Sequence, residues 1–144
     1  MGTSTMGKVI VTAKIENLED LYKVKQGILA ADKVRQVEVN DALVDTGATG
    51  LSVPKNLIVR LGLDPMRKRR ARTSAGTVDV QTYGAVRLTI QGRDCIGDVT
   101  EISDDCPVLI GQVPLELLDF VVDPVKQQLI GNPAHGGEQM IELY

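Results

Sequence analysis

Hydrophobic and polar residues alternate along several short stretches of the chain, and a period of two residues is typical of strands with one buried face. The clearest alternation places four residues on one side, Val9, Val11, Ala13 and Ile15. Residues 34–39 and 42–45 predict two further strands with a turn at Asn40 and Asp41 between them. The sequence PVLIG at 107–111 predicts a short buried strand.

Helical signals are few and short. Asn17 can cap a short helical turn, because acidic residues follow it and apolar residues fall on one side. Residues 52–62 predict a helix that starts near Pro54 and ends at Gly62. Pro114 opens a second short helix.

Two hairpins are expected. The longer one has a first arm from about residue 67, a turn around Ala75 and Gly76, and a return arm through residue 90. After a turn at 91–94, another strand follows, and a final hairpin turns at residues 123–124. Residues 134–144 form a tail in which one more strand could form. With no internal repeat and no linker, residues 1–144 are predicted to be one mostly β domain.

Composition sets the limits of this domain. A chain of 144 residues with 43% hydrophobic residues can bury a core, and with so few aromatic residues that core must consist of Val, Leu, Ile and Ala. The net charge of −3 does not favour a nucleic-acid partner. The chain has no apolar run long enough for a membrane span and no N-terminal signal-peptide pattern, so we expect a cytoplasmic protein.

Several residues that carry chemistry elsewhere are more simply explained by structure. Cys95 and Cys106 lack metal-site spacing, and reduced, packed thiols are expected. His135 is the single histidine, so we expect no Ser-His-Asp triad, no metal site and no cofactor. The basic residues at 67–72 could bind nucleic acid or mark a processing site, but a solvated face of a strand is favoured. Tyr83 could cover an active site, although a core position is favoured.

The sequence LVDTGATG, residues 43–50, sets an aspartate at the end of an apolar strand and follows it with a tight loop. Asp-Thr-Gly by itself fits an ordinary turn equally well. A second buried run that ends in glycine, VLIG, lies downstream, with Gly111 66 positions after Asp45. The glycine-tipped sequence TSAGT lies between them.

Together these segments resemble the retropepsin-like aspartic proteases. LVDTGAT is similar to the catalytic loop of that family, VLIG to its hydrophobic-hydrophobic-glycine motif, and RTSAGTV to its flap. The resemblance implies a closed β-barrel with a flap hairpin and one or two short helices. It divides the chain into an N-terminal extension (1–33), a protease core (34–133) and a tail (134–144). The extension is a candidate for an interface strand.

The resemblance also implies roles for individual residues. Asp45 matches the catalytic aspartate, and Thr46 matches the residue whose hydroxyl braces two active-site loops against each other. Gly47 and Ala48 match the loop beside bound substrate, and Gly111 matches the glycine that lets the second buried strand pass under that loop. The flap tip that would cover substrate comprises Ser74, Ala75, Gly76 and Thr77.

Peptide hydrolysis by carboxylates needs two of them, one ionised to activate water and one protonated to donate to the carbonyl. The chain has one Asp-Thr-Gly, so the second Asp45 is expected from a second subunit of a two-fold homodimer. The implied function is an aspartic endopeptidase that acts on peptides or proteins. Thr49, Gly50 and Gln112 replace charged residues of the viral enzymes, so their intersubunit polar lock is expected to be absent. A protease-like dimeric binding module with little or no turnover is the alternative function.

Overall fold

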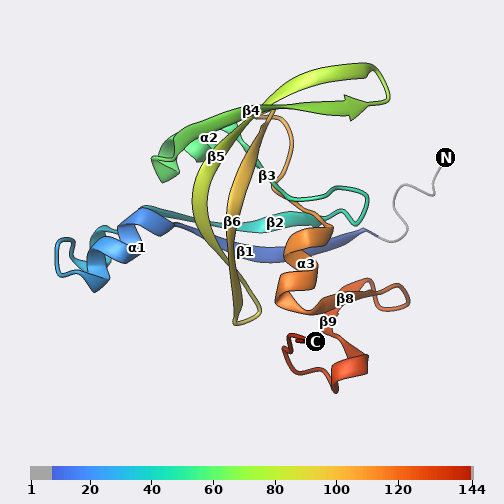
Figure 1. Cartoon of the computed structure of the whole chain (residues 1–144). Coiled ribbons are helices and arrows are strands. Elements are labelled where there is room, and N and C mark those ends of the chain that lie inside the picture. The colour runs from blue at the N-terminus through green and yellow to red at the C-terminus, as the bar shows by residue number, and fades with distance from the viewer. Residues whose placement is uncertain (1–7, 144) are drawn as a thin grey trace.

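The computed structural model describes residues 8–143, which are mostly strand (Figure 1). The strands are β1 Val9–Asn17, β2 Gln36–Val44, β3 Leu51–Pro54, β4 Asp64–Thr73, β5 Gly76–Ile90, β6 Arg93–Ile102, β7 Leu109–Ile110, β8 Phe120–Asp123 and β9 Gln128–Gly131. The helices are α1 Leu18–Lys25, α2 Lys55–Leu61 and α3 Gln112–Leu118, with short 3-10 turns η2 Ala31–Lys33 and η3 Pro133–His135. The prediction of a mostly β chain is confirmed.

The strands of the main sheet other than β4 form a ring of backbone pairings. The order in the sheet is β1-β2-β7-β3-β6-β5-β4, and β1 also pairs with β5, so the order returns on itself. Only the parallel pairs β2–β7 and β3–β6 depart from the antiparallel pattern of the ring. A separate hairpin of β8 and β9 lies beside α3 (Figure 1).

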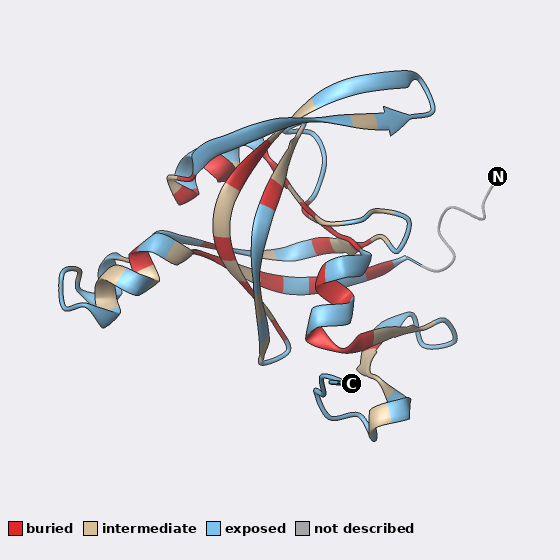
Figure 2. Ribbon diagram, viewed as in Figure 1, coloured by how far each residue is buried: buried red, intermediate tan, exposed pale blue. Residues whose placement is uncertain are grey.

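The core is aliphatic, as the composition predicts. Figure 2 shows buried residues on the strands that form the ring and on the helices that pack against it. The largest fully buried side chains include Ile15, Ile58, Leu61, Leu88, Ile90, Ile110, Leu115 and Leu118. Tyr83 is also buried, and its hydroxyl donates to Glu101 (2.6 Å), so its predicted core position is confirmed.

The prediction of two strands separated by a turn at Asn40 and Asp41 is wrong. A single strand, β2, runs through both residues. Val11 pairs with Ala42 and Ala13 pairs with Val39, which leaves Asn40 and Asp41 opposite Thr12 alone. This two-against-one arrangement is a β-bulge, which accommodates turn-forming residues without ending the strand.

The N-terminal segment is part of the core. β1 pairs with β2 on one side and with β5 on the other, and Ala13 and Ile15 are fully buried. Asn17 caps α1 as predicted, since its side chain accepts from the backbone N–H of Asp20 at 3.0 Å. The Asp20 carboxylate in turn accepts from the backbone N–H, Nε and Nη2 of Arg35, at 3.0, 2.8 and 2.9 Å.

Most of the remaining elements were predicted. The long hairpin, the helix ended by Gly62, the helix that contains Pro114 and the final hairpin are all present. The strand β3 was missed, because the predicted helix was extended back to residue 52. Up to residue 143, the tail contains the 3-10 turn η3 and no strand, so the expectation of a strand there is wrong.

Candidate active site

Asp45 lies where β2 ends. The last residues of β2, Leu43 and Val44, pair in parallel with Leu109 and Ile110 of β7. The backbone N–H of Asp45 continues this ladder by donating to the carbonyl of Ile110 at 2.9 Å. The aspartate is therefore fixed at its backbone by a buried pair of strands, while its side chain is half-buried at the surface.

The loop after Asp45 turns tightly around the aspartate. The backbone N–H of Gly47 donates to Oδ1 of Asp45 at 3.0 Å, and the N–H of Ala48 donates to the Asp45 carbonyl at 3.0 Å. The first bond orients the carboxylate relative to its own backbone, and the second closes the turn. A Cβ at Gly47 would lie 3.3 Å from Oδ1 of Asp45, so a side chain there would crowd the carboxylate.

The second glycine segment passes directly beneath this loop. The N–H of Gly111 donates to the carbonyl of Gly50 at 2.9 Å. At the start of α3, the N–H groups of Gln112 and Val113 donate to the carbonyls of Ala48 and Thr49, at 2.9 and 2.8 Å. Three backbone bonds therefore hold the loop against the chain that enters α3.

Gly111 has no room for a side chain. A Cβ there would lie 2.5 Å from the carbonyl oxygen of Gly50 and 2.8 Å from that of Ala48, both backbone atoms. Because its φ is −87°, Gly111 is required by close approach and not by backbone conformation. The sequence pattern identified this glycine, but it gave no signal for the Gln112 and Val113 amides, since any residue has them.

Thr46 is exposed at the tip of the same loop. Within residues 8–143, no hydrogen bond involves its hydroxyl. The bracing role that the family resemblance gives to Thr46 is therefore not met by a hydrogen bond within the described residues and stays a prediction.

The hairpin of β4 and β5 extends well beyond the ring. Its arms pair from Asp64 with Gly84 to Thr73 with Gly76, so Ser74 and Ala75 form a two-residue turn. Oγ1 of Thr73 accepts from the N–H of Ala75 at 3.2 Å and donates to the carbonyl of Gly76 at 2.9 Å. Gly76 has a φ of 118°, which favours glycine.

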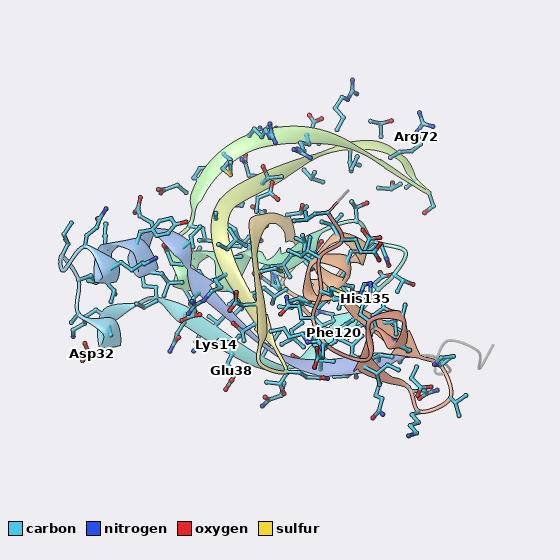
Figure 3. All side chains as sticks on the ribbon, turned by 60° about the horizontal axis from the view of Figure 1, so that its bottom comes forward. Lys14, Asp32, Glu38, Arg72, Phe120 and His135 are labelled. Carbon is cyan, nitrogen blue, oxygen red and sulfur yellow. The ribbon has the colours of Figure 1, made fainter. Side chains whose placement is uncertain are left out.

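This hairpin and the loop after Asp45 lie on the same side of the molecule. In Figure 1 the distal end of the hairpin and the loop between β2 and β3 both extend to the right, and the rotated view in Figure 3 keeps them on one side. Ser74, Ala75, Gly76 and Thr77 are all exposed at that distal end. The structure thus brings the Asp45 loop and Gly111 into direct contact and leaves the hairpin tip free in solvent.

The other residues considered in the sequence lie apart from this loop. Cys95 is partly buried, and desolvation raises the pKa of its thiol to about 11, so it is a protonated packing residue. Cys106 is a free thiol but is exposed, so the packing role predicted for it is wrong.

His135 lies 2.6 Å from Oδ2 of Asp119 and 2.8 Å from Oε1 of Glu142, and these contacts attach the tail beside α3. The bond to Asp119 is the main cause that raises the pKa of His135.

A comparison with known protein families adds to this geometry. A model of the aspartyl protease family matches residues 32–128, which include the Asp45 loop, the long hairpin and Gly111. The chain belongs to the aspartyl protease family. None of the curated proteins compared with the chain matches it. No helix in residues 8–143 is long and apolar enough to cross a membrane.

Proposed function

We propose that the protein is a homodimeric aspartic endopeptidase in which Asp45 of each subunit contributes to one shared site. The observation that carries this proposal is the fixed Asp45 loop within a chain of the aspartyl protease family. A carboxylate held by a parallel strand pair and by backbone bonds from below is presented in one orientation, which general acid–base chemistry requires.

The second carboxylate is expected from a second chain, because the sequence contains Asp-Thr-Gly once, at residues 45–47. Carboxylate catalysis of peptide hydrolysis needs an ionised and a protonated group side by side, and two such groups share a proton because both cannot ionise at short distance. A two-fold axis beside the Asp45 loop meets this need with two copies of one residue.

The exposed Thr46 hydroxyl fits the same arrangement. It lies next to Asp45 on the loop, where a second copy of the loop would face it across the axis. The long hairpin, a flap in this proposal, would cover a peptide bound as an extended strand beside the loop. Main-chain pairing then gives affinity, and alternate side chains enter pockets.

The test is cleavage of a mixed peptide library by the wild-type protein and by Asp45→Asn, with products identified by mass spectrometry. Asparagine keeps the shape and can still accept the Gly47 N–H, but it cannot ionise. We expect the wild-type protein to cut and Asp45→Asn to lose at least about a hundredfold in rate. Equal cleavage by both proteins would rule out Asp45 as the catalytic group.

The alternative, a dimeric binding module, gives a different result in the same assay. The wild-type protein would then bind peptides without cutting them. Thr49, Gly50 and Gln112 stand where the resemblance to the viral enzymes implies charged residues. This difference is the observation that favours the alternative.

A further inference from the structure

We propose, building on the proposed function, that the basic arm of the long hairpin selects acidic peptide segments as substrates. Arg67, Lys68, Arg69, Arg70 and Arg72 are five exposed cations within six consecutive residues of β4. They lie on the element that would close over a bound peptide.

The charge of this hairpin is opposite to that of the rest of the chain. Residues 64–83 carry five basic and two acidic side chains, a net charge of +3, whereas the whole chain carries −3 and its remainder therefore −6. A local potential of one sign on a body of the other sign orients an approaching ligand, because it attracts anions to one element and repels them elsewhere.

The cations of the arm are almost uncompensated. Arg70 lies 3.9 Å from Asp79 of the opposite strand, and both side chains are more than two-thirds exposed, so this pair is weak. For Arg67, Lys68, Arg69 and Arg72, no ion pair is found in the part of the chain that the structure describes. Figure 3 shows Arg72 near the distal end of the hairpin, away from Asp32 and Glu38.

Basic side chains occur on both faces of the hairpin. Residues directly opposite one another share a face in an antiparallel pair. Lys68, Arg70 and Arg72 lie opposite Gln81, Asp79 and Thr77 on one face, whereas Arg69 and Ala71 lie opposite Val80 and Val78 on the other. Cations occur on both faces, so an acidic segment meets positive charge whichever face the hairpin turns toward it.

A peptide is favoured over nucleic acid as the occupant because the whole chain is acidic. A nucleic acid extends far beyond one hairpin and would meet the net charge of −6 on the remainder of each subunit. A short acidic segment, with Asp or Glu near the bond that is cut, needs only the hairpin.

The test compares two peptides that share a cleavable sequence and differ only in flanking residues, three Glu in one and three Gln in the other. We expect the ratio of kcat/KM, acidic over neutral, to be about tenfold at low salt and to fall toward one as salt is raised. The variant in which Arg67, Lys68, Arg69 and Arg72 are all changed to Gln should bring this ratio close to one.

A matched control removes the same charge elsewhere. Lys8, Lys25, Lys33 and Lys126 are four exposed lysines outside the hairpin, and none has an ion pair in the described residues. Changing all four to Gln gives the same net charge as the hairpin variant. We expect this control to keep most of the preference for the acidic peptide, and an equal loss in both variants would overturn the proposal.

The outcomes also separate this inference from the proposed function. If neither peptide is cut, the proposed function fails, and fluorescence anisotropy of the two labelled peptides still tests the hairpin. Equal cleavage or equal binding of the two peptides overturns the inference alone, and the basic arm is then a solvated face. Tighter binding of a single-stranded oligonucleotide than of the acidic peptide would also overturn it.

Discussion

At the residue scale, the candidate site depends on backbone atoms more than on side chains. The sequence identified Asp45 and Gly111 because both follow apolar runs. It could not identify the amides of Gln112 and Val113, which hold the loop through the carbonyls of Ala48 and Thr49. Every residue other than proline has an amide, so only the fold decides which amides meet the loop.

Replacement of Gly111 tests this close contact. In Gly111→Ala, the new methyl would meet backbone oxygens of the Asp45 loop, so the loop must move. We expect a loss of about 1–3 kcal/mol in the free energy of unfolding, measured by urea denaturation, together with a loss of cleavage. Gly97→Ala is the matched control, because nothing lies within 4 Å of a Cβ there. Equal stability of the two variants would contradict the contact.

At the element scale, periodicity predicted strands and hairpins well where each strand pairs with its neighbour in sequence. The long hairpin and the hairpin of β8 and β9 are of this kind. The strand β3 was missed because its partners, β6 and β7, are distant in sequence and one of the pairings is parallel. The bulge in β2 was missed because Asn40 and Asp41 are turn-forming residues, and the pairing with β1 that holds them within one strand is distant in sequence.

The attachment of α1 to the core gives an element-scale prediction. Asp20 is 3% exposed, and its hydrogen bond with the Arg35 side chain is the main cause that lowers its pKa. In Asp20→Ala, the backbone N–H and the guanidinium of Arg35 lose their charged acceptor, and we expect a loss of about 1–3 kcal/mol in the free energy of unfolding at pH 7. Glu19→Ala removes an exposed acid of the same helix and should cost less than about 0.5 kcal/mol.

The effect of Asp20 should depend on pH with a definite sign. A carboxylate whose pKa is lowered by folding contributes its full stability above the unfolded value of about 3.9. The contribution is lost as pH falls through the lower, folded-state pKa. Urea denaturation of the wild-type protein and Asp20→Ala should therefore show a difference in the free energy of unfolding that narrows below about pH 4. A difference that widens on acidification would contradict this account.

The hairpin tip can be removed without touching the core. Deleting residues 72–77 and joining Ala71 to Val78 through Asn-Gly keeps a paired register and a turn suited to a two-residue loop. The removed residues are all exposed, so we expect an unchanged urea midpoint and a loss of peptide cleavage. Changing Ser74 to Asn and Ala75 to Gly at full length is the control, and it should keep activity. Full turnover by the shortened protein would mean that the hairpin does not cover the substrate.

At the scale of the whole molecule, the proposed chemistry needs two carboxylates, and the sequence contains a single Asp-Thr-Gly. The family was predictable from the order of three short motifs, and the ring of strands was predictable only as a consequence of that resemblance. The pairing of β1 with both β2 and β5 was not predictable, because strand alternation does not say which strands meet.

Subunit mixing tests the shared site directly. If each centre needs Asp45 from both chains, a dimer with one Asp45→Ala subunit lacks either the acid or the base and is inactive. After equal amounts of wild-type and Asp45→Ala chains exchange fully, random pairing leaves about one quarter of the dimers fully wild-type. Activity per wild-type chain should therefore fall to about half. A mixed dimer lacks the repulsion between two Asp45 carboxylates, so it is favoured over the wild-type dimer, and activity per wild-type chain falls further. Exchange is verified by mass spectrometry of the intact dimers, and full retention of activity after exchange would exclude a centre built from two Asp45 residues.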